Sequence, residues 1–181
     1  MKRSNFNEAG ANNPVRIEQV FAEKPAGGLV VDPHFDAPET TAVYADDDKF
    51  KVIKAYRLVD AVESTDTSIK IAKGSGIVVG DVIGHGTLAV ASTAVTEGDD
   101  YDTVTVTLGV DIANGTVLYQ AAAASADAAT PKGTPVYVTG NAIKGGEGDQ
   151  PVRLINGANL RKETANIALE VVAQLKNINL V

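Results

Sequence analysis

From Lys49 onward the chain is divided into short apolar runs, and turn-favouring residues such as glycine, proline, asparagine, aspartate or serine separate one run from the next. The clearest run is Thr103–Leu108, in which threonines alternate with hydrophobic residues as in a half-buried strand. Its hydrophobic members are Val104, Val106 and Leu108. The other runs are 50–59, 68–72, 76–79, 81–83, 87–90, 117–119, 136–138 and 152–155. Many short strands joined by turn residues indicate a barrel or a sandwich, so we predict a mainly β protein.

One turn pattern recurs among these runs: a glycine, a small polar residue, and then the first apolar residues of the next run. It occurs at Gly80–Ile83, Gly115–Leu118 and Gly133–Tyr137. Glycine supplies the positive φ that a tight turn needs, and aspartate or threonine can hydrogen-bond the backbone that follows. We interpret this pattern as a structural turn that carries no chemistry of its own.

Residues 1–48 differ in composition from the rest of the chain. Asparagines and a proline favour turns in 1–16, and the prolines and glycines of 25–38 are spaced too closely for a helix or an inner strand. Charge is segregated too, with a net charge of +2 over 1–16 and −6 over 25–48. We predict an extended N-terminal arm over 1–48 and a β domain over 49–181. The alternative is a disordered tail without a partner.

The C-terminal segment carries the pattern of an amphipathic helix. Thr164 can cap a helix over 165–176, and four residues at helical spacing would form its buried face. They are Ala168, Val171, Val172 and Leu175. Residues 178–181 then alternate like a final strand. The predicted fold is therefore a small β-barrel or sandwich, tulip-like in outline, with one C-terminal helix and an extended N-terminal arm.

Composition excludes several classes of function. Cysteine is absent, which rules out disulfides, thiolate metal sites and cysteine nucleophiles. With only His34 and His85, a histidine zinc site would need carboxylates or a second chain. The net charge of −7 argues against a nucleic-acid partner, and no apolar stretch is long enough to cross a membrane. No apolar run follows Lys2 and Arg3, so we expect no signal peptide and a cytosol-like compartment.

Two motifs resemble catalytic or cofactor sites without completing them. The glycines of 74–80 suggest a dinucleotide loop, but the third glycine is one position late and β-branched residues follow where a helix should begin. His85 lies four residues after Asp81, yet neither Ser75 nor Ser92 sits in a nucleophile-elbow sequence. We interpret His85 as a surface turn residue, and we expect no catalytic site and no cofactor.

Acidic residues cluster in two places: Asp99, Asp100 and Asp102 near Glu97, and Asp46–Asp48. Such clusters can bind Ca²⁺, but the EF-hand spacing is absent, so we favour solvated hairpin tips and leave cation binding open. Asn114–Thr116 is formally a glycosylation sequon. Because no secretion signal accompanies it, its Asn-Gly pair indicates a turn instead.

Several segments occur in a recognisable order: Lys54–Val59, Ile69–Gly74, Val79–Gly84, Tyr101–Asp102, Thr107–Tyr119, Leu154–Gly157, Leu160–Glu163 and Leu175–Ile178. In this order they resemble the head fibre proteins of tailed bacteriophages, especially those that infect Bacteroides-type hosts. The ending is also similar to that of smaller phage head decoration proteins. The resemblance covers about residues 50–181.

The resemblance implies a non-enzymatic virion protein, a homotrimer on the capsid exterior with its N-terminal part toward the shell. The major capsid protein would be its partner, and assembly would take place in the host cytoplasm. We hypothesise that the arm is the capsid anchor and becomes ordered on that partner. The apolar arm residues that would bind are Ile17, Val20, Phe21, Leu29, Val30, Val31 and Phe35.

Two other functions compete with this one. A carbohydrate-binding adhesin module would use the outer loops 120–130 and 140–149 to bind host glycans, and the same loops could hold another fibre protein. An enzyme such as a virion-associated hydrolase is the third possibility. Particle copurification, glycan binding and polymer turnover would separate the three.

Overall fold

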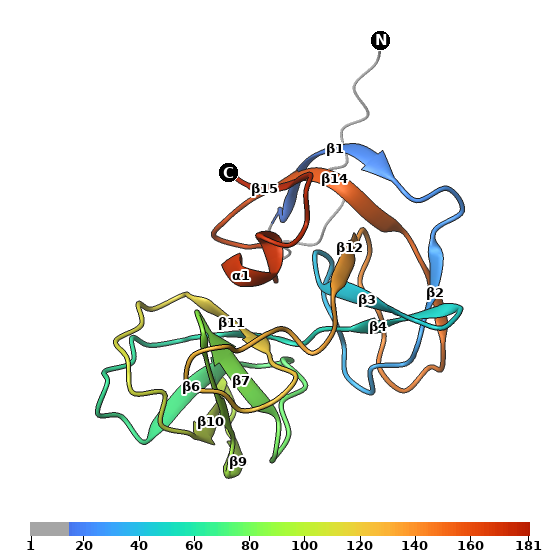
Figure 1. Cartoon of the computed structure of the whole chain (residues 1–181). Helices are drawn as coiled ribbons and strands as arrows, with labels where there is room; N and C mark the ends of the chain where they lie inside the picture. The colour runs from blue at the N-terminus through green and yellow to red at the C-terminus, as the bar shows by residue number, and fades with distance from the viewer. Residues whose placement is uncertain (1–14) are drawn as a thin grey trace.

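The computed structural model describes residues 15–181 and shows a mainly β protein with two lobes (Figure 1). The barrel lobe comprises residues 15–52 and 132–181. The inserted lobe, residues 53–131, is placed between these two segments in sequence. Every paired strand has its partners within its own lobe. The predicted small β-barrel or sandwich with one C-terminal helix is confirmed.

The barrel lobe is one curled sheet in the order β1-β14-β12-β3-β4-β2-β13, with β15 paired to β14. Its strands are β1 (Ile17–Glu23), β2 (Gly28–Val30), β3 (Ala42–Asp46), β4 (Lys49–Val52), β12 (Pro135–Thr139), β13 (Gln150–Val152), β14 (Leu154–Leu160) and β15 (Ile178–Leu180). The path starts at β1 and ends at β13, but β1 continues along the chain into β2 and β13 continues into β14. The segment β1–β2 therefore pairs with the segment β13–β14 at both ends of the path, as β1 with β14 and as β2 with β13. This double pairing curls the sheet into a half-barrel.

The bend between β1 and β2 depends on glycine. Gly27 has a φ of +64°, and a Cβ built there would lie 2.4 Å from the carbonyl oxygen of Val152. Only glycine fits both the conformation and the close approach. The bend turns β2 over the lobe's own core, whose buried residues are Val30, Ala37, Val43, Ile143, Val152 and Leu154.

The inserted lobe contains two smaller sheets, β6-β10-β9 and β5-β11-β7-β8. The strands are β5 (Ala55–Arg57), β6 (Ser68–Ala72), β7 (Val82–His85), β8 (Leu88–Ala91), β9 (Ala94–Glu97), β10 (Tyr101–Thr105) and β11 (Val117–Gln120). A separate core lies between them, and the apolar face predicted for the threonine run belongs to it: Val104, Val106 and Leu108 are all buried. The alternation of this run therefore predicts its buried face correctly.

A third core joins the lobes. It combines Ala55 and Tyr119 of the inserted lobe with Ile155, Val171 and other residues of the barrel lobe. The one-turn helix α1 (Leu169–Val172) lies between the lobes and contacts β11. The guanidinium of Arg57 adds polar links, donating to the carbonyl oxygens of Gly115 at 2.8 Å and Ala165 at 2.6 Å.

The structure corrects the predicted arm. Residues 17–23, 28–30 and 42–46 are strands of the barrel lobe, paired with β14, β13 and β12. The expected boundary at 48/49 falls inside the β3–β4 hairpin, where Asp46 faces Lys49. Strands β12, β13 and β14, together with β4, supply the partners of these three strands, and local composition cannot reveal the distant ones. Residues 1–14 of the predicted arm lie outside the described residues.

Two further predictions fit only in part. The helix expected over 165–176 is reduced to the four residues of α1, and the hydroxyl of Thr164 donates to the carbonyl oxygen of Val15 instead of capping it. The buried face is nevertheless correct for Ala168, Val171 and Leu175. The run 76–79 forms a loop that leads into a turn at Val79 rather than a strand, because Gly76 and Gly80 both take positive φ.

Candidate functional site

A buried carboxylate joins three distant segments of the chain. Asp81 follows the turn glycine before β7, and its side chain is 9% exposed. Its Oδ2 accepts hydrogen bonds from Lys54 Nζ at 2.7 Å, from the Tyr56 hydroxyl at 3.1 Å and from the Val78 N–H at 3.1 Å. Its Oδ1 accepts one from Gln120 Nε2 at 3.1 Å. Asp81 is thus fully occupied by internal donors, as a buried charge requires.

The same network keeps the phenol of Tyr56 neutral. Burial raises the pKa of Tyr56, and the charge of Asp81 and the hydrogen bond to it raise that pKa further. Tyr56 therefore acts as a permanent hydrogen-bond donor in this cluster. It is a structural partner of the carboxylate and is unsuited to be a proton acceptor at neutral pH.

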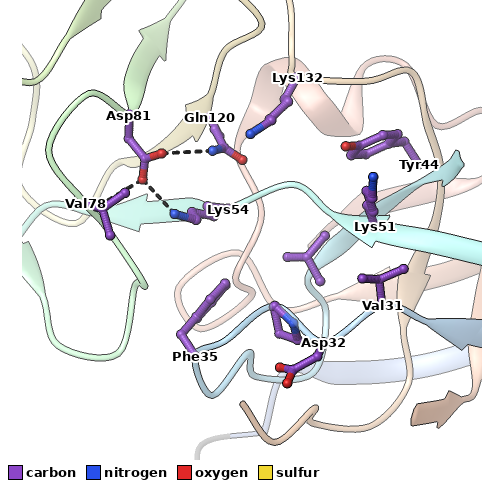
Figure 2. Close-up of a pocket in the computed structure, with 12 residues that line it drawn as sticks. Val31, Asp32, Phe35, Tyr44, Lys51, Lys54, Val78, Asp81, Gln120 and Lys132 are labelled. Carbon is purple, nitrogen blue, oxygen red and sulfur yellow. Dashed lines mark hydrogen bonds and ion pairs between the residues drawn. The ribbon is translucent and has the colours of Figure 1, made fainter. Parts of the chain in front are cut away.

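The network forms one wall of a cleft of about 350 Å³ between the lobes, which we call the junction cleft (Figure 2). The lining residues come from the loop after β2, from β3 and β4, and from three parts of the inserted lobe and its exit. They are Val31, Asp32, Pro33, Phe35, Tyr44, Lys51, Val52, Lys54, Val78, Asp81, Gln120 and Lys132. The volume is at the lower end of the range seen for small-molecule sites.

The second acid of the junction cleft is also occupied. The carboxylate of Asp32 accepts backbone N–H groups of His34 at 2.8 Å, Gly146 at 2.9 Å and Gly148 at 3.2 Å. These bonds, chiefly those from Gly146 and His34, hold the pKa of Asp32 below its usual value. The carboxylate is therefore ionised at neutral pH and serves to fix the 144–149 loop against the loop after β2.

The three lysines of the junction cleft differ in their pairing. Lys54 is bound to Asp81, and Lys51 forms a half-exposed ion pair with Asp46 at 2.7 Å. Lys132 makes no side-chain hydrogen bond or ion pair with residues 15–181, although its backbone N–H donates to the carbonyl oxygen of Gln120 at 2.9 Å. One cation at the mouth of the cleft is thus without a protein partner in the described chain.

His85 does not complete a catalytic triad with Asp81. Its Nδ1 lies 3.5 Å from Oε1 of Glu170 on α1 and is buried without a hydrogen-bond partner in the described residues. Glu170 accepts the backbone N–H of Gly86 at 2.5 Å. These residues border a second cleft of about 540 Å³ between β7 and α1, at which the exposed Leu169 lies. Ser75 and Ser92 are both buried.

Members of both acidic clusters form ion pairs or turns at hairpins. Asp102 forms an ion pair with Lys73 at 2.6 Å and faces Glu97 across β9 and β10. Asp46 pairs with Lys51, and Asp47 takes a positive φ in the β3–β4 turn. Within the described residues, no three side chains of His, Asp or Glu are grouped as a metal site would require. Asn114 and Gly115 form the predicted turn, with a φ of +78° at Gly115.

The seven residues proposed to bind the capsid are divided between core and surface. Val30 is fully buried, Ile17 and Val20 pack on the joint core, and Phe35 packs on the barrel core. Val31 and Phe35 also line the junction cleft. Only Phe21 and Leu29 of the seven are exposed. Burial corrects the assignment of Val30 as a contact residue, and capsid binding by the others stays a prediction.

The sequence contains no motif that indicates the junction cleft. It singles out Asp81 as the polar residue of a repeated turn and as a candidate partner of His85, while Lys54 and Gln120 belong to segments with no shared motif. Comparison of the chain with protein-family models, curated proteins and solved structures gives no match. Among the described residues, no helix has the length and apolar character needed to span a bilayer.

Proposed function

We propose that the chain is a structural virion protein, a head fibre that decorates the capsid exterior of a tailed bacteriophage as a homotrimer. The order of motifs over residues 50–181 supports this proposal, and so does the division of the chain into two lobes. In Figure 1, β1, β14 and β15 lie at one end of the molecule and the inserted lobe lies at the other. One end can thus hold the major capsid protein while the other points outward.

The observation that carries the proposal is that β1 has one edge without a strand partner among the described residues. This strand ends the path of the curled sheet and pairs only with β14 among the described strands. An unpaired strand edge is a surface that other chains can extend by main-chain hydrogen bonds. Phe21 on this strand is 54% exposed, an apolar contact beside the open edge. Capsid attachment is assigned to this edge, which replaces the extended arm as the anchor.

The experiment uses an antibody against the recombinant full-length chain and purified particles from the source that carries its gene. Immuno-electron microscopy should label the heads of tailed particles. Labelling confined to tails, or absent from particles, would exclude the proposal. Light scattering of the purified chain should give the mass of a trimer. The mass of a monomer at micromolar concentration would contradict the trimeric state that we propose.

A pair of surface variants tests the assigned edge. Phe21→Asp places a charge beside β1, and Val79→Asp places the same charge on an exposed turn of the inserted lobe. Phe21→Asp should abolish rebinding to capsids that lack the protein, while Val79→Asp should bind like the unmodified chain. Equal binding by both variants would show that the anchor lies elsewhere. Circular dichroism of each variant establishes that it is folded.

A further inference from the structure

The junction cleft contains one donor and one acceptor that the described chain leaves unused. The donor is the ammonium of Lys132, which has no ion-pair partner in residues 15–181. The acceptor is the amide oxygen of Gln120, whose Nε2 is held by Asp81 while its Oε1 accepts no hydrogen bond from the described residues. Figure 2 shows the side chain of Lys132 pointing toward this amide. The two groups are thus positioned to act on one ligand.

The two carboxylates of the cleft do not serve as ion-pair partners of Lys132. Asp81 is bound by four internal donors, and Asp32 by three backbone N–H groups. Neither acid is available to neutralise Lys132. Lys51 and Lys54 are paired with Asp46 and Asp81, so Lys132 is the one lysine of the cleft without an ion-pair partner in residues 15–181. An anion is therefore the ligand that this ammonium favours.

Apolar side chains line the cleft on two sides. Val31 and the ring of Phe35 come from the loop after β2, and Val78, which is 55% exposed, lies next to Asp81 (Figure 2). The ammonium of Lys54 lies 5.9 Å from the centre of the Phe35 ring, which fixes one side of that ring. The cavity of about 350 Å³ corresponds to about a dozen water molecules. It can hold a single six-membered sugar ring with an apolar C–H face against the valines and the phenylalanine.

We propose that the junction cleft binds a sugar acid, a pyranose ring that carries a carboxylate, such as a hexuronic acid or a sialic acid. The carboxylate pairs with Lys132, and a ring hydroxyl donates to Oε1 of Gln120. A simple carboxylate would leave Gln120 unused, and a neutral sugar would leave Lys132 unused. A phosphate is less suited, because the other two lysines of the cleft are already in ion pairs. This site goes beyond capsid attachment and does not depend on it.

The test is a titration of the full-length chain with glucuronate, followed by heteronuclear NMR and calorimetry. Glucuronate should bind saturably and shift the Gln120 side-chain amide signals. Glucose and the methyl ester of glucuronic acid should each bind about tenfold more weakly, because they lack the charge that Lys132 recognises. Lys132→Gln should weaken glucuronate binding by a similar factor. The exposed Lys176→Gln, away from the cleft, should leave binding unchanged.

A second pair of variants tests the apolar rim. Val78→Asp adds a negative charge to the cleft and should weaken glucuronate binding by about tenfold or more. Val79→Asp adds the same charge at the next residue, which does not line the cleft, and should have a smaller effect. The proposal is overturned if no sugar acid binds, if glucose binds as well as glucuronate, if inorganic phosphate competes as strongly as glucuronate, or if Lys132→Gln retains full affinity. These outcomes are independent of the immuno-electron microscopy that tests capsid decoration.

Discussion

The ammonium of Lys54 lies 2.7 Å from the carboxylate of Asp81, and this pair fixes the exit from β4 against the turn before β7. Both side chains are largely buried, at 16% and 9% exposure. A buried ion pair contributes little net stability, but removing one partner leaves the other charge uncompensated. Tyr56 and Gln120 would lose their acceptor as well. The pair is thus a fixed point between the lobes.

Asp81→Ala should lower the free energy of unfolding by about 3–5 kcal/mol, since it leaves the Lys54 ammonium buried without a partner. Urea denaturation at pH 7 measures this loss. The matched control is Asp60→Ala, which removes the carboxylate from the exposed Lys70–Asp60 pair. An exposed pair is worth at most about 1 kcal/mol. Equal losses in the two variants would mean that Asp81 is more solvated than the structure shows.

Gly76→Ala should disturb the contact between the lobes. Gly76 has a φ of +65°, and a Cβ there would lie 2.3 Å from the ring of Phe35. Gly74→Ala is the control, because Gly74 has a similar φ of +77° with nothing within 4 Å of its Cβ position. The control should lose about 1–2 kcal/mol from backbone strain alone. Gly76→Ala should lose clearly more and shift the NMR signals of Phe35; identical losses would show that the ring moves aside freely.

Leu175→Ala should cost about 2–5 kcal/mol, because Leu175 is buried in the core that joins the lobes. Lys176→Ala, one residue later and exposed, should change the free energy of unfolding by less than about 0.5 kcal/mol. Glu170 is unsuitable as a neutral control, since it accepts the N–H of Gly86. Thermal denaturation followed by circular dichroism compares the two variants, and similar melting would place Leu175 outside the core.

The loop that Asp32 holds should loosen in acid. The pKa of Asp32 is lowered in the folded protein, so its stabilising effect is present above the unfolded value of about 4 and is lost as the pH falls through the lower folded value. The amide signals of Gly146 and Gly148 should therefore shift with a midpoint below pH 4. Asp32→Asn should remove this transition from the Gly146 signal. A midpoint above 4 would contradict the hydrogen bonds to Asp32.

A chain that begins at Lys49 should fail to form the barrel lobe, because β1, β2 and β3 would be missing. Circular dichroism should show a loss of cooperative unfolding, together with aggregation from the uncovered β12 and β14. A chain that begins at Val15 keeps every described strand and serves as the control. If the fragment 49–181 were soluble and unfolded cooperatively, the domain boundary at 48/49 that composition predicts would be correct.

How well the sequence predicts a segment depends on whether the residues that fix its structure are neighbours in sequence. The alternation around Val104 predicts both a strand and its buried face, because neighbours in sequence fix the strand's two faces. Residues 17–30 give no such signal, since their antiparallel partners lie on β13 and β14, and β3 pairs with the distant β12 as well as with the adjacent β4. The network of Asp81 is equally non-local: Lys54 and Gln120 resemble many other polar residues until folding brings them to one carboxylate.

The C-terminal helix is also predicted only in part, because one of its contacts comes from a distant segment. Helical spacing correctly indicated that Val171 and Leu175 face a core. It could not indicate that Thr164 is engaged by Val15 from the opposite end of the sequence. With its predicted cap engaged elsewhere, the helical segment begins only at Leu169.

The insertion of residues 53–131 between β4 and β12 also governs when the barrel lobe can form. Ile17 and its partner Leu160 are more than 140 residues apart, a very high contact order for a chain of this size. Such pairings form slowly, because a long loop must close before any contact is gained. On the ribosome β1 emerges long before β14, and β2 and β3 meet β4 early but wait for β13 and β12. The inserted lobe, whose strand pairs are all internal, can fold first and bring the two halves of the barrel together.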